Sequence, residues 1–378
     1  MKAVAIVTGD FVRTGGMDVA NFHLARHLAR AAEEVHLVAH RVDDELLALP
    51  TVHWHRVAKP LGSYLLGAGA LARAGRRWSR VLAARGGRTI VNGGNCVSPD
   101  TNWVHYVHAG HQPAIATSTV RRILGGWKHA RYVAEEREAL RAARLVIVNS
   151  NATGREITGG LGVPAARVHT VYYGTDASYH RPPTAEERTE ARDALGWHDA
   201  RPGVAFVGAL GDRRKGFDLL FAAWSRLCED PGWDSRLTVV GTGNELPAWR
   251  RAAASAGLGD RIQFVGFTRD VRRVLWACDA IAAPARYEAY GLAVHEAVCC
   301  GLPAIVNPEA GVAERLAGLE GLQPERPGDA AALATALRRW RSDRDTWADA
   351  ARRASTALRA WSWDDMAARI VGLMEEAA

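Results

Sequence analysis

The sequence predicts an α/β protein made of two doubly wound domains, each with a parallel β-sheet. Short apolar runs rich in β-branched residues alternate with longer segments of helical spacing, which is typical of such sheets. The alternation starts again after a polar stretch with two prolines at 181–188, which divides the 378 residues nearly in half. Because one hydrophobic core seldom extends over so long a chain, we expect two similar Rossmann-like domains facing a central cleft.

The strands are expected where short apolar runs end in Gly, Asn or Pro, as in strands that are buried on both faces. Segments between them, such as 219–227, carry the apolar spacing of helices. A last helix should begin after Ser362, whose hydroxyl suits the N-cap position, with Met366 and Ile370 on its buried face. The expected strands are 3–7, 35–39, 89–91, 103–107, 145–148 and 168–171, followed by 204–207, 237–240, 262–265, 280–283 and 304–306.

Composition excludes several classes of protein. Apolar residues make up 48% of the chain and charged residues 24%, values that are typical of a globular protein and not of a disordered one. The five cysteines are odd in number and include no C-x-x-C spacing, which argues against a disulfide framework and against a zinc ribbon. The first residues lack the pattern of a signal peptide and no apolar run is long enough to span a membrane, so we expect a cytoplasmic protein.

The net charge of +7 and the isoelectric point near 9.4 raise two alternatives. A nucleic-acid-binding surface would need clustered cations among stacking aromatics, and the best cluster, at 121–132, is offset by Glu135, Glu136 and Glu138. A basic amphipathic segment at 65–85 would suit peripheral contact with an anionic membrane. The favoured interpretation of that segment is a helix that covers the sheet and keeps its arginines in water. We therefore expect no nucleic-acid partner, and peripheral membrane contact stays the less favoured alternative.

The most informative motif is the stretch 283–297, in which a buried strand ends and a helix begins near Gly291. Glu288 lies in the loop before the helix and Glu296 lies inside it. The first amides of a helix have no partner within the helix and favour an anion, while carboxylates favour hydroxyl groups. A sugar nucleotide presents both kinds of group. The amides that would bind its phosphates are those of Tyr290, Gly291 and Leu292.

Two further loops follow predicted strands and open helices. The loop at 207–218 has glycines and three consecutive cations, Arg213, Arg214 and Lys215, which suit a diphosphate but do not match the phosphate-binding loop of a phosphoryl-transfer enzyme. Near the start of the chain, Gly15 and Gly16 would let the backbone approach a ligand closely.

Taken in order, these stretches resemble the retaining glycosyltransferases of family four, which have the GT-B fold and use nucleotide sugars. The Glu288–Glu296 element, followed by Gly301-Leu302-Pro303, carries most of the resemblance, which extends over nearly the whole chain. It implies an N-terminal acceptor-binding domain at 1–180 to which the C-terminal helix, 361–378, returns. It also implies a linker at 181–200 and a nucleotide-sugar donor-binding domain at 201–360.

The resemblance also implies roles for single residues. Lys215, with Arg213 or Arg214 and the Gly16 amide, would bind the donor diphosphate, and Gly15 is a secondary candidate. Glu288 would contact the transferred sugar and Glu296 the ribose hydroxyls. The loop at Gly266 and Phe267 would lie beside the base.

A histidine at the end of a first-domain strand is also implied, near the reacting carbon. His105, His108 and His111 are the candidates, and alternation along a strand would place His105 and His108 on opposite faces. We assign His108 because it would end the strand, with His111 as the second choice. The expected catalytic residues are therefore His108, Lys215 and Glu288.

One departure from the family pattern bears on the diphosphate. Family members commonly have an arginine after the glycine of the second-domain loop, whereas Ala209 follows Gly208 here. Another arginine must then assist Lys215, and the candidates are Arg213, Arg214 and Arg286, with Arg213 preferred.

The implied activity is transfer of a sugar, with retention at the anomeric carbon, from a nucleotide diphosphate to a small or carrier-bound acceptor. Such a reaction would belong to natural-product or cell-envelope saccharide synthesis. UDP is the preferred base because it is the commoner one in the family, and neither a metal ion nor another cofactor is expected. The alternative within the same fold is a sugar-nucleotide epimerase, which would act on the donor without an acceptor.

Overall fold

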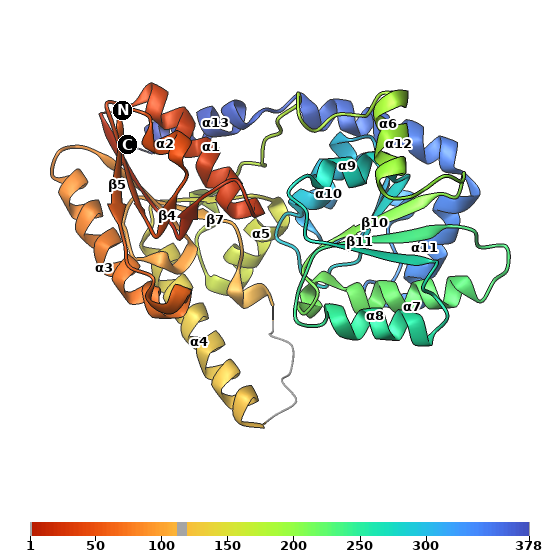
Figure 1. Cartoon of the computed structure of the whole chain (residues 1–378). Coiled ribbons are helices and arrows are strands. Elements are labelled where there is room, and N and C mark those ends of the chain that lie inside the picture. Colours follow the sequence, from red (N-terminus) through yellow and green to blue (C-terminus); the bar gives the residue numbers. More distant parts are fainter. Residues whose placement is uncertain (1, 112–118, 378) are drawn as a thin grey trace. The chain divides into compact units, whose positions relative to one another are not determined.

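The computed structural model describes residues 2–111 and 119–377, with the side chains of 119–124 left out. The chain forms two units, one made of Met1–Gly174 and Ser362–Ala378 and the other of Thr175–Trp361. Each unit has its own parallel sheet with helices packed around it (Figure 1). The expected fold class, two doubly wound α/β domains, is therefore confirmed.

The N-terminal unit is built on seven parallel strands in the order β5-β3-β1-β6-β7-β8-β9. All five residues of the inner strand β1 are buried. Because β3 pairs with one side of β1 and β6 with the other, the order in which successive strands are added to the sheet reverses at β1. In such parallel sheets, ligands bind at the carboxyl ends of the strands beside this reversal point. The strands are β1 (Ala3–Val7), β3 (Glu34–Ala39), β5 (Val52–Arg56), β6 (Arg88–Asn92), β7 (Thr101–Val104), β8 (Leu145–Val148) and β9 (Val168–Thr170), and a second small sheet pairs β2 (Asp10–Phe11) with β4 (Arg41–Val42).

The last helix of the chain packs on the N-terminal unit, as expected. Ser362 caps it with a reciprocal hydrogen-bond pair to Asp365, and the Trp363 ring stacks on His23 of α1 at 4.7 Å between ring centres. Met366 and Ile370 are buried, so this helix contributes to the core of the unit. The helices of the unit are α1 (Gly16–Ala31), α2 (Asp44–Leu47), α3 (Tyr64–Ala83), α4 (Thr119–Ala142), α5 (Asn151–Glu156) and α13 (Trp363–Glu376).

The C-terminal unit has five parallel strands in the order β12-β11-β10-β13-β14. Its strand order reverses between β10 and β13, so the loops after these two strands meet at the carboxyl edge of the sheet. The strands are β10 (Gly203–Val207), β11 (Arg236–Val240), β12 (Ile262–Gly266), β13 (Ala280–Ala283) and β14 (Ala304–Val306). The helices are α6 (Ala185–Ala194), α7 (Phe217–Cys228), α8 (Leu246–Ser255), α9 (Val271–Ala277), α10 (Leu292–Cys299), α11 (Ala330–Ser342) and α12 (Arg344–Arg359).

The stretch 181–200, expected as a linker, contains helix α6 and belongs to the C-terminal unit. Thr184 and Glu187 cap α6 reciprocally, and Arg188 binds Asp279 at 2.9 Å between Nη2 and Oδ1. These contacts hold α6 on the C-terminal unit, so the boundary moves from residue 180 to between Gly174 and Thr175.

Two strands of the seven-stranded sheet differ from expectation, and the short strands β2 and β4 were not expected either. The strand expected at 103–107 is β7, which begins at Thr101 and ends at Val104, so neither His105 nor His108 belongs to it. The edge strand β5 was not expected, because its sequence Val-His-Trp-His-Arg lacks an apolar run. It pairs with β3 on one side only, and its polar residues are partly packed, since the His55 ring stacks on Trp78 and its Nε2 lies 2.8 Å from Nδ1 of His36.

Helix α3 covers the sheet of the N-terminal unit with part of its surface, as the favoured interpretation of 65–85 requires. Leu71 and Leu82 are buried, whereas Leu65 and Leu66 are 45% and 53% exposed. Over residues 2–111 and 119–377, none of the helices combines the length and the apolar character needed to cross a membrane. The basic cluster at 121–132 lies partly outside the described side chains.

Candidate active site

The loop after β10 carries the three consecutive cations and is fixed against its neighbouring strand. Gly208 N donates to Val240 O at 3.0 Å, and Leu210 N donates to Thr242 O at 2.9 Å. At Gly241, a side chain would collide with the carbonyl oxygen of Gly208. Glycine is therefore required there for the two backbones to approach so closely.

The arginines around this loop differ in how strongly they are engaged. Arg214 forms an ion pair with Asp212 at 2.6 Å, and Arg286 binds both carboxylate oxygens of Asp218 at 2.8 Å. The guanidinium of Arg213 lies 3.6 Å from Asp218, and its side chain is 54% exposed. Of the three arginines that could assist Lys215, Arg213 thus has the weakest contacts with carboxylates of the protein.

Lys215 and Glu288 lie together. Nζ of Lys215 is 2.5 Å from Oε2 of Glu288, and both side chains are about three-quarters buried. Gly216 follows Lys215 with φ of 72°, a left-handed conformation that ends the short 3-10 turn Arg213–Lys215 and starts α7. The structure therefore brings together the residues expected to contact the diphosphate and the transferred sugar.

The loop before α10 is braced by the segment 311–315. Gly311 N donates to Glu288 O at 3.1 Å, and Val312 N donates to Tyr290 O at 2.7 Å. Gly291 has φ of 107° and serves as the N-cap, so α10 begins at Leu292 as expected. The buried Tyr290 hydroxyl lies 2.8 Å from Nδ1 of His295, which gives this side chain a structural role. The N-terminal end of α10 favours an anion.

Glu296 lies one turn into α10, and burial raises its pKa to about 7. Its carboxylate is 3.8 Å from Nε2 of His180, whose own pKa burial lowers to about 4. His180 was not predicted as a site residue, because a single histidine in the sequence does not indicate a partner that is distant along the chain. The base candidates lie at the end of β12, where Gly266 has φ of 83° and Phe267 is 66% exposed.

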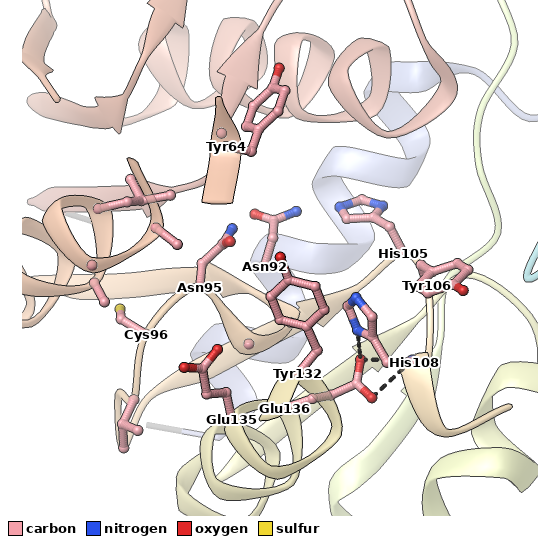
Figure 2. A pocket seen from close by; sticks show the side chains of 18 of the residues that line it. Tyr64, Asn92, Asn95, Cys96, His105, Tyr106, His108, Tyr132, Glu135 and Glu136 are labelled. Carbon is pink, nitrogen blue, oxygen red and sulfur yellow. Dashed lines mark hydrogen bonds and ion pairs between the residues drawn. The ribbon is translucent and has the colours of Figure 1, made fainter. Parts of the chain in front are cut away.

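The N-terminal unit contains a cavity of about 730 Å³ at the carboxyl ends of β1 and β6 (Figure 2). It lies where the strand order of this sheet reverses. Asn92, Asn95, Tyr132 and His108 point toward it from different elements (Figure 2). The start of α1 contributes Met17 and Asp18, which follow the expected glycine pair. Gly15 has φ of 92° and caps α1, which begins at Gly16.

Two of the three candidate histidines line this cavity. His105 is buried, lies 2.5 Å from the Tyr173 hydroxyl, and has a pKa that burial lowers to about 3. His108 is 35% exposed, and its backbone N and Nδ1 lie 3.0 and 3.1 Å from the carboxylate of Glu136. His108 begins a 3-10 turn and does not end a strand, so that reason for choosing it was wrong. His111, the second choice, is not among the lining residues.

Two Rossmann-like units, each with polar groups at the strand ends where the sheet order reverses, are characteristic of GT-B glycosyltransferases. Residues 14–179 match the family described as Glycosyltransferase Family 4, and residues 201–343 match Glycosyl transferases group 1. The chain belongs to the family-four glycosyltransferases. The resemblance inferred from the sequence motifs is thereby confirmed.

Relatives of this chain act on different acceptors. A D-inositol 3-phosphate glycosyltransferase of Salinispora tropica is 28% identical over 94% of this chain and 79% of its own length. A 2-deoxystreptamine glucosyltransferase of Streptomyces kanamyceticus is 29% identical over 59% of this chain and 56% of its own length. The solved structure of Anabaena Alr3699/HepE in complex with UDP is 19% identical, covers 100% of both chains and gives a TM-score of 0.71.

Proposed function

We propose that this protein is a retaining, metal-independent hexosyltransferase. It moves a sugar from a UDP-sugar to a hydroxyl or amine of a small or carrier-bound acceptor, in natural-product or cell-envelope saccharide synthesis. The observation that carries this proposal is the Lys215–Glu288 pair, which lies in the C-terminal unit with the loop that leads into α10. UDP is preferred as the base because the structure of Anabaena Alr3699/HepE contains it.

On the donor side, the chain's task is to stabilise negative charge on the leaving diphosphate. Lys215 supplies a cation, the N-terminal end of α10 favours an anion, and Arg213 has a guanidinium that only weak contacts engage. These groups neutralise the negative charge that develops on the diphosphate, so the proposed reaction requires no metal ion. Glu296 accepts hydrogen bonds from the ribose hydroxyls, and the exposed ring of Phe267 stacks on the base.

On the acceptor side, the cavity of the N-terminal unit holds the attacking group. The acceptor oxygen or nitrogen forms its bond to the anomeric carbon on the face from which the diphosphate leaves. The departing phosphate oxygen takes the acceptor's proton, so the configuration is retained without a nucleophilic residue. His108, oriented by Glu136, positions the sugar or the acceptor at this carbon.

Thermal-shift measurements with UDP-, GDP-, ADP- and TDP-sugars test the donor assignment. A ligand present at about 100 times its dissociation constant adds about 2.7 kcal/mol to the unfolding free energy. We expect this stabilisation from UDP-sugars and from UDP, with or without EDTA. A donor whose sugar is altered when no acceptor is present would instead identify a sugar-nucleotide epimerase.

A further inference from the structure

Two residues that line the cavity in the N-terminal unit carry buried oxygen atoms that lack a hydrogen-bond donor among the described residues. Asp10 is 1% exposed, and its Oδ2 accepts from Arg41 and from the Tyr64 hydroxyl. Its Oδ1 has no hydrogen-bond partner in the described part of the chain. Asn92 is 4% exposed and donates from Nδ2 to Asn21 at 3.1 Å, which leaves its Oδ1 without a donor among the described residues. A buried acceptor without a donor is costly, so this wall favours a ligand that donates.

Asp18 adds a carboxylate to the same wall. It lies in the first turn of α1, lines the cavity, and has no ion pair or hydrogen bond of its side chain within the described ranges. Burial and the neighbouring charge of Asp10 raise its pKa to about 7, while Arg41 and Lys59 oppose that shift. A cationic group of a ligand would remove this repulsion and hold Asp18 ionised.

Of the two arginines that line the cavity, one is paired. Arg131 forms an ion pair with Glu135 at 2.8 Å, and Arg41, which is not a lining residue, is held by the Asp10 carboxylate. Arg76 also lines the cavity, opposite in charge to Glu138, and neither forms an ion pair with any described residue. The groups that remain to be satisfied are therefore mainly acceptors and carboxylates, which attract N–H and O–H donors.

A phosphate fits this wall poorly. It brings acceptor oxygens and negative charge to a surface on which Asp18 and Glu138 have no ion-pair partner among the described residues, whereas Arg41 and Lys59 already compensate Asp10. An ammonium group brings three donors and a positive charge, and ring hydroxyls bring further donors for Asn92 and Asn95. A cavity of about 730 Å³ lies within the usual size range of small-molecule sites.

We propose that this cavity binds an amine-bearing polyhydroxylated ring, an aminocyclitol or an amino sugar. Its ammonium group lies between Asp18 and Asp10, and its hydroxyls reach Asn92. Its use as the glycosyl acceptor rests on the function proposed above, whereas its binding does not. Asp18 is the residue that determines specificity. Among the carboxylates that line the cavity, it is half-buried and forms no ion pair with a described residue, whereas Glu135 is paired and Glu138 is exposed.

Calorimetric titration of the full chain with three six-membered carbocycles of differing charge tests this proposal. The probes are 2-deoxystreptamine with two ammonium groups, neutral myo-inositol, and inositol 3-phosphate. We expect 2-deoxystreptamine to bind at least about tenfold more tightly than myo-inositol, the effect of one charge-assisted hydrogen bond, and the phosphate to bind most weakly. Tightest binding of the phosphate, or equal binding of all three, would overturn the proposal.

The variant Asp18→Asn keeps the size of the side chain and removes its charge. It should weaken 2-deoxystreptamine by about tenfold and leave myo-inositol nearly unchanged. Glu33→Gln, an exposed carboxylate of the same unit outside the cavity, is the matched control and should change neither. An Asp18→Asn protein that retains the full preference for the diamine would contradict the assignment.

Titration of the same samples with UDP separates the two proposals. If UDP binds and the diamine is not preferred, the acceptor inference fails while the donor assignment survives. If the diamine is preferred and neither UDP nor any UDP-sugar binds, the proposed transferase function fails while the binding site survives.

Discussion

Nζ of Lys215 and Oε2 of Glu288 are 2.5 Å apart, so an ion pair joins the loops that follow β10 and β13. The two residues are far apart in the sequence and meet because their strands are neighbours where the sheet order reverses. In the protein without donor, Glu288 compensates the charge of Lys215. A bound diphosphate must therefore compete with Glu288 for this ammonium group.

The substitution Glu288→Gln should separate nucleotide binding from turnover. Without the carboxylate, Lys215 is free to bind the diphosphate, so UDP should bind about twofold to fivefold more tightly, the usual strength of a partly exposed pair. Turnover should fall by about tenfold to a hundredfold, because the transferred sugar loses a charged hydrogen bond. Calorimetry and steady-state kinetics measure the two effects, with the exposed Glu309→Gln as control. Equal losses in binding and turnover would contradict the role of Glu288.

The three arginines should respond differently to alanine substitution. Arg213→Ala should weaken UDP by about tenfold to a hundredfold, because its guanidinium is the one most available to the diphosphate. Arg286→Ala should instead lower the melting temperature, since it breaks the double contact with Asp218. Arg214→Ala should behave like Arg286→Ala because Asp212 holds this side chain. If Arg213→Ala binds UDP as wild type does, the compensation for Ala209 lies elsewhere.

Glu296 should make UDP affinity depend on pH. Its pKa of about 7 lies above the ordinary carboxyl value, so the side chain is neutral below pH 7 and ionised above it. Because the ionised form accepts the ribose hydrogen bonds, affinity should rise as pH increases from about 6 to about 8. The phosphate of UDP also titrates in this window, so Glu296→Gln is the comparison. The affinity ratio of wild type to this variant should grow with pH, and a constant ratio would count against the ribose contact.

Two glycines with nearly the same backbone conformation test how tightly the donor loop is packed. Gly216 and Gly196 have φ of 72° and 73°, but only Gly216 faces an obstacle, the carbonyl oxygen of Pro284. Gly196→Ala should cost about 1–2 kcal/mol of unfolding free energy from the left-handed conformation alone. Gly216→Ala should cost more and should also weaken UDP, because Lys215 precedes it. Chemical denaturation measures both losses. Equal losses for the two variants would show that the loop can shift to accommodate a side chain at Gly216 and would contradict tight packing.

The sequence predicted those parts of the fold that depend on local patterns. The strands 3–7, 145–148, 280–283 and 304–306 match β1, β8, β13 and β14 residue for residue, since each is an uninterrupted apolar run. The edge strand β5 was missed because its run Val-His-Trp-His-Arg holds two histidines, and their ring contacts with His36 and Trp78 could not be predicted from the sequence. The linker was misjudged because the position of α6 depends on Arg188 and its distant partner Asp279.

The candidate site was predictable to a similar extent. The resemblance to the family-four glycosyltransferases implied that Lys215, Glu288 and the start of α10 would act together on the donor. The contacts of Glu136 with His108 and of His180 with Glu296 were not predictable, because each joins residues distant in the chain. Neither Glu136 nor His180 belongs to a recognisable sequence motif.

One calorimetric series tests most directly whether the C-terminal unit binds a uridine diphosphate through Lys215. UDP is titrated into the wild-type protein, into Lys215→Ala, and into the control Glu33→Gln, an exposed carboxylate of the other unit outside its cavity. We expect UDP to bind to the wild type and to Glu33→Gln with the same affinity. We expect a loss of about a hundredfold or more in Lys215→Ala, on the order of 3 kcal/mol for a charge-assisted contact. Binding of UDP to Lys215→Ala with wild-type affinity, or no binding to the wild type, would contradict this assignment.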